Sequence, residues 1–275
     1  MCLHLKPTAF RRWVVHQGVK MKGAIIGDII GSVYEFDNTF DYNFPLLTEY
    51  STFTDDTICT VAIADALLNK KPYAQTLKEW CRQYPNPKGS YGTMFQDWIW
   101  SDNPNYHTNS FGNGALMRIS SLGLINVSPQ QAFLNTQQAT TCSHDHPIAI
   151  AYALTYIRIL RRLRLYKNKK IAVETMIDSI GKRWDKEIPT KGTFTDTCQS
   201  TLPLAVSLFL ESQNFEDAIR LAVSYGGDSD TLAAIVGGMA EAYYGVPDSL
   251  WDKVKDLLPE SMLTIIDQFY NTYSI

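Results

Sequence analysis

The chain has 275 residues, of which 45% are hydrophobic and 19% charged, a composition typical of a globular protein that can bury a large core. Its formal net charge of −3 argues against a general nucleic-acid binder. No stretch approaches the roughly 18 uninterrupted apolar residues that a membrane-spanning helix needs, so no membrane association is expected.

Residues 1–20 differ from the rest of the chain, because they contain four basic residues and no acidic one. They lack the apolar region and the small-residue cleavage site of a secretion signal. A helical pattern begins directly after Met21 and Lys22. We therefore expect residues 1–20 to be an extension outside the fold, with Met21 as a natural start, and residues 21–275 to form one domain. A weakly amphipathic arm is the alternative for the extension.

The cysteines indicate the compartment. Their number is odd and none are spaced as C-x-x-C, which is unlike a zinc site or a disulfide framework; they are Cys2, Cys59, Cys81, Cys142 and Cys198. Free thiols suit a reducing compartment, so a cytoplasmic protein is expected, and a monomer is the default expectation.

Residues 23–35 read as a buried helix with a glycine every fourth residue, at Gly23, Gly27 and Gly31. Since each glycine costs about 1 kcal/mol of helix propensity relative to alanine, something must offset that cost: close packing against another helix, or a ligand. Asp28 is expected to be a buried, hydrogen-bonded carboxylate that orients its neighbours. Glu35 stands at the helix end, before the loop of residues 36–51, where it could reach a pocket and move with the loop. A solvated surface glutamate is the alternative.

The stretch Phe53-Thr-Asp-Asp-Thr57 precedes an apolar helical run at 58–68 and places two carboxylates and a hydroxyl at a helix entrance. A short helix follows at 73–82. Residues 84–110 are rich in Pro, Asn, Gly and Ser, with a short helical piece around Trp98 and Trp100. An irregular connection of this kind commonly forms the wall of a site.

The stretch 110–118 contains Gly112-Asn113-Gly114 before a short helix. Exposed backbone N–H groups at such a helix start could bind an anion. The stretch does not match the G-x-G-x-x-G or the P-loop motif, and a plain turn is the alternative.

Two histidines, His144 and His146, flank Pro147, which is expected at the first position of a long helix over 148–166. No third His or Cys ligand is evident nearby, which disfavours zinc. Phosphate recognition by one histidine, and capping or packing by the other, fits better.

Helices are expected at 195–210, with Asp196 as the cap, and at 215–224, 229–244, 249–258 and 261–273. The stretch Tyr225-Gly-Gly-Asp-Ser-Asp-Thr231 opens the third of these helices with two more carboxylates and a hydroxyl. Convincing period-two alternation is absent throughout. The sequence predicts an all-α protein, a single orthogonal bundle of about ten or more helices.

The two acidic helix entrances, 53–57 and 225–231, have the same chemistry. One Asp would suffice as a cap, and capping remains the alternative for each stretch. Two helix starts facing one pocket would pool four carboxylates, which repel one another unless cations lie between them. Oxygen-only ligands suit Mg²⁺ or Mn²⁺, so a two-metal site follows.

The chain resembles the ADP-ribosylglycohydrolase family in five stretches in the same order: 23–35, 53–57, 111–118, 143–147 and 225–245. The acidic pair is the specific part of the match. Ser143 replaces the commoner Thr, and Tyr225 stands where many members have an aliphatic residue.

The resemblance implies an all-α fold and a binuclear Mg²⁺ or Mn²⁺ centre, with Glu35 as a mobile acid beside the metals. The implied metal ligands are Thr54, Asp55, Asp56, Asp228, Asp230 and Thr231. The implied substrate-binding residues, which would hold the ribose and diphosphate of ADP-ribose, are Phe111, Gly112, Asn113, Gly114, Ala115 and His144.

The expected reaction is hydrolysis of the N- or O-glycosidic bond between ADP-ribose and a protein side chain or small molecule, with Glu35 or Asp55 transferring protons and ADP-ribose as a product. Two rivals remain. One is a metal-dependent phosphate ester hydrolase, although that chemistry expects its Asp after an apolar strand. The other is an inactive ADP-ribose-binding module. The sequence does not identify the acceptor, which could be arginine, serine, a nucleic-acid base or a metabolite.

Overall fold

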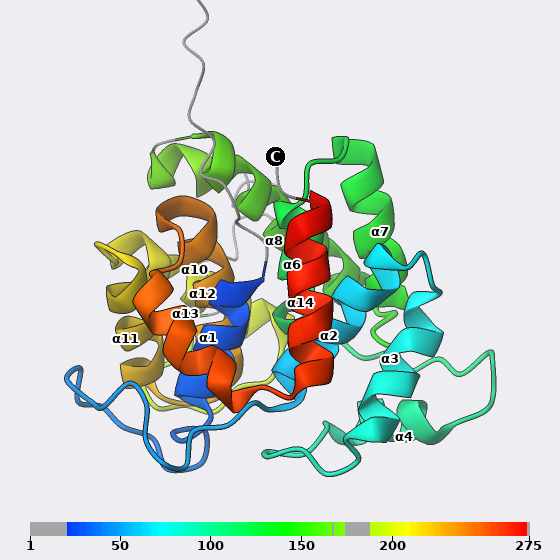
Figure 1. The fold of residues 1–275 in the computed structure, drawn as a ribbon, viewed down its shortest axis with the longest axis horizontal. Coiled ribbons are helices and arrows are strands. Elements are labelled where there is room, and N and C mark those ends of the chain that lie inside the picture. The colour runs from blue at the N-terminus through cyan, green and yellow to red at the C-terminus, as the bar shows by residue number, and fades with distance from the viewer. Residues whose placement is uncertain (1–20, 167, 174–187, 274–275) are drawn as a thin grey trace, which may run out of the picture.

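The computed structural model describes residues 21–166, 168–173 and 188–273, and these form thirteen α-helices and one 3-10 helix (Figure 1). The described residues contain two isolated β-bridges and no strand. The predicted all-α fold with ten or more helices is therefore confirmed. Within the described part, no helix is both long and apolar enough to cross a bilayer. The predicted extension, residues 1–20, lies outside the described residues.

In chain order the elements are α1 (Lys22–Gly31), α2 (Asp55–Leu68), α3 (Tyr73–Gln83), α4 (Thr93–Trp100), α5 (Gly114–Met117), α6 (Ser120–Leu124), α7 (Pro129–Thr141), α8 (Pro147–Leu165), α10 (Cys198–Glu211), α11 (Phe215–Tyr225), α12 (Ser229–Tyr244), α13 (Asp248–Val254), the 3-10 helix η2 (Lys255–Leu257) and α14 (Glu260–Tyr273).

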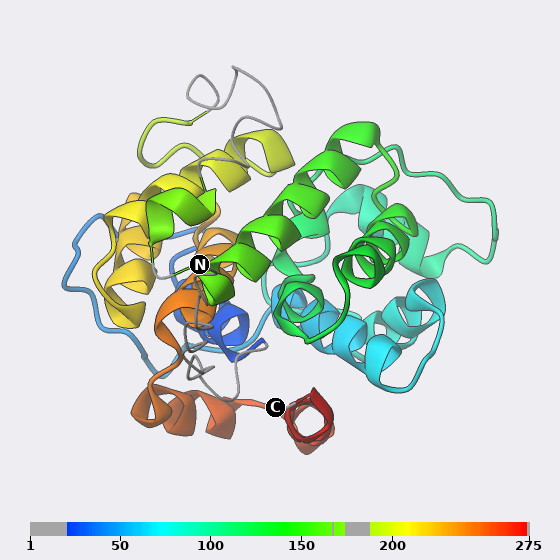
Figure 2. The same ribbon diagram turned by 90° about the horizontal axis from the view of Figure 1, so that it is seen from above.

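Helix α12 forms the centre of the molecule. Every residue from Ser229 to Ala242 is buried, as expected for a helix that is apolar around its whole circumference. Helices α1, α8, α10 and α11 pack around it, while α2, α3 and α4 lie to one side (Figures 1 and 2). The start of α12, which carries the second acidic stretch, is thereby fixed from several directions.

The glycine stripe of α1 lies against α12, as predicted. A Cβ atom added at Gly23 would lie 2.3 Å from the Gly237 carbonyl oxygen, and one at Gly27 would lie 2.1 Å from that of Ala233. A Cβ at Gly31 would meet the backbone of Asp230 at 2.5 Å. Because only glycine permits this approach, the two helices pack backbone to backbone, and the end of α1 reaches the start of α12.

We expect Gly27→Ala to destabilise the fold, because its methyl group collides with backbone that cannot rotate away. Overpacking of this kind costs about 1–3 kcal/mol, and each kcal/mol lowers the Tm by about 2–4 °C in a chain of this size. Gly92→Ala is the matched control, since its Cβ would have no neighbour within 4 Å. Calorimetric melting that gave both variants the same Tm would show that the α1–α12 contact is loose.

Side chains from α12 and α14 cap the N-terminus of α1. The Gly23 N–H donates to the buried carboxylate of Glu241 at 2.8 Å. The Tyr270 hydroxyl donates to the other oxygen of Glu241 and accepts from the N–H groups of Met21 and Lys22. These bonds satisfy backbone donors that a helix leaves free at its start, and they tie the C-terminal helix to the first one.

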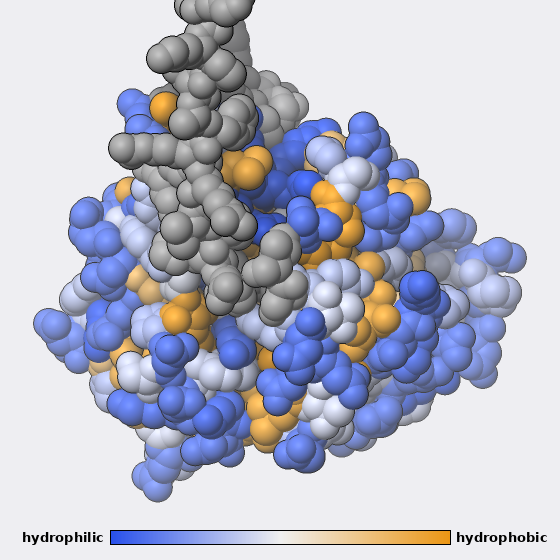
Figure 3. All heavy atoms as spheres, turned by 45° about the horizontal axis from the view of Figure 1, so that its top comes forward, coloured by the Kyte–Doolittle hydropathy of each residue, from blue (hydrophilic) through white to orange (hydrophobic). Residues whose placement is uncertain are grey.

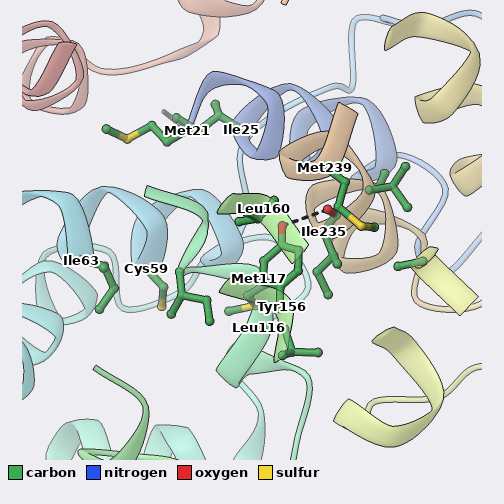
Figure 4. Close-up of a cluster of buried hydrophobic side chains, with 14 of the residues drawn as sticks. Met21, Ile25, Cys59, Ile63, Leu116, Met117, Tyr156, Leu160, Ile235 and Met239 are labelled. Atoms are coloured by element: carbon green, nitrogen blue, oxygen red, sulfur yellow. Dashed lines mark hydrogen bonds between the residues drawn. The ribbon is translucent and has the colours of Figure 1, made fainter. Parts of the chain in front are cut away.

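Tyr156 of α8 lies in the hydrophobic core, and its hydroxyl donates to the Ile235 carbonyl of α12 at 2.9 Å (Figure 4). Gly238 leaves room for that phenol, since a Cβ there would lie 2.4 Å from the hydroxyl oxygen. On the face seen in Figure 3, hydrophilic side chains predominate and apolar ones form small, separate patches. Four cysteines in the described residues are free thiols, as predicted: Cys59, Cys81, Cys142 and Cys198.

Candidate active site

A pocket of about 430 Å³ lies where the two acidic helix starts meet. Its wall contains residues from both acidic stretches, from residues 89–95 at and before the start of α4, from the glycine-rich stretch at 110–118, and from the segment 194–196. The shared chemistry of the two acidic stretches predicted that they lie together, and the structure brings them to one pocket. Six acidic residues line it: Glu35, Asp55, Asp56, Asp196, Asp228 and Asp230.

The two helix starts are joined directly. Asp55 and Asp56 occupy the first turn of α2, and Asp228 immediately precedes α12, with Asp230 in its first turn. The Thr231 hydroxyl donates to a carboxylate oxygen of Asp56 at 3.3 Å. Gly226 and Gly227 turn the chain into α12 with φ of 78° and 82°, a conformation that favours glycine.

Asp28 orients the start of α2, as expected for it. Its fully buried carboxylate accepts from the N–H and the hydroxyl of Thr54 at 3.0 and 2.7 Å, and also from the N–H and hydroxyl of Thr57. The Thr54 hydroxyl in turn accepts from the Asp56 N–H and so caps the helix. Thr54 is therefore buried behind Asp55 and Asp56 and does not line the pocket.

Glu35 reaches the acidic cluster from outside any helix. Helix α1 ends at Gly31, four residues earlier than predicted, because the chain turns through residues 32–34. Oxygen atoms of Glu35, Asp228 and Asp230 lie within 4.8 Å of one another. A surface position for Glu35 is excluded, since its Oε2 is buried without a hydrogen-bond partner.

The electrostatics of the cluster favour protonation or a cation. Burial is the largest cause that raises the pKa of Glu35, to about 7, and the carboxylates of Asp228 and Asp28 add to it. Burial likewise raises the pKa of Asp56 and of Asp230 well above the ordinary range, and neighbouring carboxylates raise both further. The pKa values of Asp55 and Asp228 are also raised, chiefly by burial.

These residues fit the binding of divalent cations. Asp56 Oδ2 and Glu35 Oε2 are buried carboxylate oxygens without a hydrogen-bond partner, and such atoms are costly unless something neutralises them. The cluster offers carboxylate and hydroxyl oxygens, the ligands that hard cations prefer. Among the described residues, Glu35, Asp228 and Asp230 have the tightest geometry for such an ion.

The stretch 112–115 forms another part of the wall. The Asn113 side chain donates to Asp228 at 2.7 Å and to the Thr201 hydroxyl at 3.3 Å, which connects this stretch to the acidic cluster. The N–H groups of Gly112, Asn113 and Ala115 already donate to Ser110 Oγ, the Asp196 carbonyl and the Gly112 carbonyl. An anion held here would use other donors, or these bonds would rearrange.

His144 supplies one such donor. Its Nδ1 lies 3.3 Å from Nη2 of Arg118, a fully buried guanidinium. Burial, aided by the positive charge of Arg118, lowers the pKa of His144 well below its ordinary value. Since arginine only donates, Nδ1 of the neutral ring accepts and Nε2 carries the proton. A Cβ at Gly114 would lie 3.0 Å from Nε2, so the glycine lets this N–H face the pocket.

Two of the predicted substrate-binding residues lie outside the pocket wall, and so does His146. Phe111 and Ala115 are not in the pocket wall: the Phe111 ring packs on His146 at 5.2 Å, and Ala115 is fully buried. His146 caps α8 by accepting from the Ile148 N–H, which matches the capping or packing role expected of one histidine.

Asp196 was predicted to cap a helix, and that prediction is wrong. Helix α10 begins at Cys198. Its cap is Thr197, one residue nearer the helix than Asp196, and the Thr197 hydroxyl accepts from the Ser200 N–H. Asp196 instead lines the pocket, and its carbonyl accepts from Asn113 N.

Several pocket residues were not predicted as individual site residues, among them Arg118, Gly89, Phe36 and Phe194. The carboxylate of Glu35 lies against Gly89, where a Cβ would meet Oε2 at 2.6 Å. The rings of Phe36 and Phe194 are stacked, with centroids 6.4 Å apart. Only Arg118 had a signal in the sequence, because it ends the stretch that contains the paired glycines.

Comparisons with known proteins agree on one family. The model of the family described as ADP-ribosylglycohydrolase matches residues 21–274. A solved structure described as an ADP-ribosylglycohydrolase-related protein complex has the same fold, with a TM-score of 0.72 at 22% identity over 93% of this chain and 98% of that one.

Several curated proteins are similar in sequence. The ADP-ribosylarginine hydrolase Tri1 of Pseudomonas putida (strain GB-1) is 25% identical over 82% of this chain and 69% of its own length. The ADP-ribosylhydrolase ARH3 of Mus musculus is 22% identical over 83% of this chain and 84% of its own. The ADP-ribosyl-[dinitrogen reductase] glycohydrolase of Rhodospirillum rubrum is 27% identical over 52% of this chain and 49% of its own.

Proposed function

This chain belongs to the ADP-ribosylglycohydrolase family, and we propose that it hydrolyses the glycosidic bond between ADP-ribose and an acceptor, using a pair of Mg²⁺ or Mn²⁺ ions. The bond joins C1 of the distal ribose to a nitrogen or oxygen atom of the acceptor. Water adds to C1, and the acceptor leaves with a proton, so the products are ADP-ribose and the unmodified acceptor. Protein acceptors and small molecules both fit this reaction.

The observation that carries the proposal is the meeting of two acidic helix starts with Glu35 in one pocket. A pair of caps would not require the two helices to converge. Asp55, Asp56, Asp228, Asp230 and Thr231 line the pocket and would hold the ions, with Thr54 behind them to position Asp56. When bound, the ions would neutralise the carboxylates and polarise water or ribose hydroxyls.

The neighbouring wall suits the rest of ADP-ribose. The Nε2–H of His144 faces the pocket and would donate to the diphosphate or proximal ribose. The N–H groups of Gly112, Asn113 and Ala115 would do so only by leaving their present acceptors. Asn113 holds Asp228 in place, so the phosphate-binding wall and the metal-binding wall are built as one unit. Phe111, which packs on His146 outside the pocket wall, would contact the ligand only at its rim.

Glu35 is suited to move a proton. A carboxyl group with a pKa of about 7 is partly protonated at neutral pH and can either give or take a proton. Its oxygen atoms lie beside those of Asp228 and Asp230, where water and C1 of the ribose would meet. Asp55 lines the same pocket and is the second candidate for this task.

Binding of ADP-ribose tests the proposal without requiring the acceptor. We expect titration calorimetry with Mg²⁺ present to show binding of ADP-ribose and far weaker binding of AMP, because AMP lacks the second phosphate and the distal ribose. Equal affinity for the two ligands would mean that the pocket recognises the adenosine half only. The acidic cluster would then have no role in holding the distal ribose.

A further inference from the structure

Glu35 depends on something outside its own helix to stay in the acidic cluster. It lies four residues beyond the end of α1, at the start of the irregular segment 36–51. Burial disfavours the charge of its carboxylate, and the carboxylates of Asp228 and Asp28 disfavour it further. A side chain in that position drifts into solvent unless the backbone that carries it is held.

Asn38 provides that hold. Its Oδ1 accepts from the Gly227 N–H at 2.7 Å, and its Nδ2 donates to the Gly227 carbonyl at 3.0 Å. The same Nδ2 lies 3.1 Å from the Glu35 carbonyl and 2.6 Å from that of Tyr34. One carboxamide thus joins the backbone of Glu35 to the residue immediately before Asp228, although these segments are 189 positions apart.

The turn at Gly226 and Gly227 is shaped to receive this side chain. A Cβ at Gly226 would lie 3.0 Å from Asn38 Oδ1, so glycine is needed for the approach as well as for its φ of 78°. On the opposite side, Gly89 offers only a hydrogen atom to the Glu35 carboxylate. The backbone of Glu35 is therefore held by Asn38, and its carboxylate lies against Gly89, which has no side chain.

We propose that Asn38 is a positioning residue, which fastens the Glu35 segment to the Asp228 turn and so holds the Glu35 carboxylate at the reacting atoms. The inference rests on the proposed function, because it assigns Asn38 an effect on turnover through Glu35. It assigns Asn38 no contact with substrate or metal.

Asn38→Ala removes the tether and leaves the acidic cluster chemically intact. We expect kcat to fall roughly 10- to 100-fold, the size of loss that a misplacement of about 1 Å produces, while the affinity for ADP-ribose stays within about 2-fold. The substrate is whichever ADP-ribosyl-arginine or ADP-ribosyl-serine peptide the wild type hydrolyses. Hydrogen exchange of the Gly227 amide, measured on the same variant, should accelerate because its acceptor is gone.

A double-mutant cycle shows whether the effect passes through Glu35. If it does, Asn38→Ala should cause little further loss in a Glu35→Gln background, since residues that act as a unit are non-additive. Tyr42→Phe is the matched control: it removes a tether in the same segment, the 2.6 Å bond from Tyr42 to Asp217 of α11, and should leave kcat near wild type.

Three results would overturn the inference: unchanged turnover in Asn38→Ala, an equal loss in the Glu35→Gln background, or an equal loss in Tyr42→Phe. If Asn38→Ala does not fold, Asn38→Asp takes its place, because it keeps the acceptor for Gly227 N–H and loses the three donated contacts. Failure of the proposed function looks different: the wild type itself would neither bind ADP-ribose nor release it, while the exchange of the Gly227 amide would still respond to Asn38→Ala.

Discussion

Glu35→Gln should retain most of the affinity for ADP-ribose while its turnover falls by about 10²- to 10⁴-fold, the usual contribution of a general acid or base. The amide has nearly the same shape and keeps the backbone held by Asn38, but it cannot take up or release a proton. Titration calorimetry with ADP-ribose and single-turnover hydrolysis, run side by side, measure the two quantities separately.

The control is Glu49→Gln, which makes the same chemical change at an exposed position in the same irregular segment. A third titration, with Mn²⁺, separates the remaining roles of Glu35. If metal affinity fell together with turnover, Glu35 would act chiefly as a metal ligand. If turnover were retained, Glu35 would leave the mechanism, and Asp55 would be the remaining candidate for proton transfer.

Asp230→Asn should abolish or strongly weaken the binding of Mg²⁺ and Mn²⁺. Its buried carboxylate is surrounded by Asp228, Asp56 and Glu35, so losing its charge removes attraction that the cations need. In the wild type, metal at about 100 times its Kd should stabilise the fold by about 2.7 kcal/mol and raise the Tm by roughly 5–10 °C. The variant should show little of this rise.

The same carboxylates give the metal-free protein a distinctive pH dependence. Because the folded state raises their pKa values, these groups bind more protons in the folded than in the unfolded chain, so the stability that they contribute is greatest at low pH and is lost as the pH rises. For Glu35 the fall extends from its ordinary pKa to about pH 7, and for the buried Asp residues it extends higher. Excess Mg²⁺ should oppose this fall, since metal and protons compete for the same oxygens.

Asp97→Asn is the control for both measurements, since Asp97 is an exposed residue of α4 outside the pocket wall. It should leave the metal-induced Tm shift and the pH dependence as in the wild type. Calorimetry that detected no metal binding to the wild type would contradict the proposed centre, and the acidic stretches would then be caps that meet in one pocket.

Features whose cause lies within a few residues could be predicted from the sequence. The glycine stripe of α1 predicted close packing, and its partner is α12. The repeated Asp-rich helix starts predicted a shared pocket, because two carboxylates at each entrance exceed what one cap needs. The burial and hydrogen bonding of Asp28 also followed, since a carboxylate inside an apolar helix needs donors, whereas its partners Thr54 and Thr57 emerged only from the structure.

Features made by distant contacts could not be predicted. Asn38 looks like a loop residue, and its partner Gly227 lies 189 positions away. Arg118 fixes the tautomer of His144 through a contact between separate elements. The error at Asp196 has a local cause: Asp, Thr and Ser are all good caps, and Thr197 lies one residue nearer the helix start.

The most direct test of the central claim is the product formed from ADP-ribosyl-arginine and ADP-ribosyl-serine peptides, identified by mass spectrometry with Mg²⁺ or Mn²⁺ and with a chelator. We predict free ADP-ribose together with the unmodified form of at least one peptide, lost with the chelator and in Asp230→Asn. Release of AMP, with a phosphoribosyl group left on the peptide, would instead show that the enzyme hydrolyses the diphosphate linkage and is a phosphohydrolase. Binding of ADP-ribose with neither peptide changed would reveal a binding module.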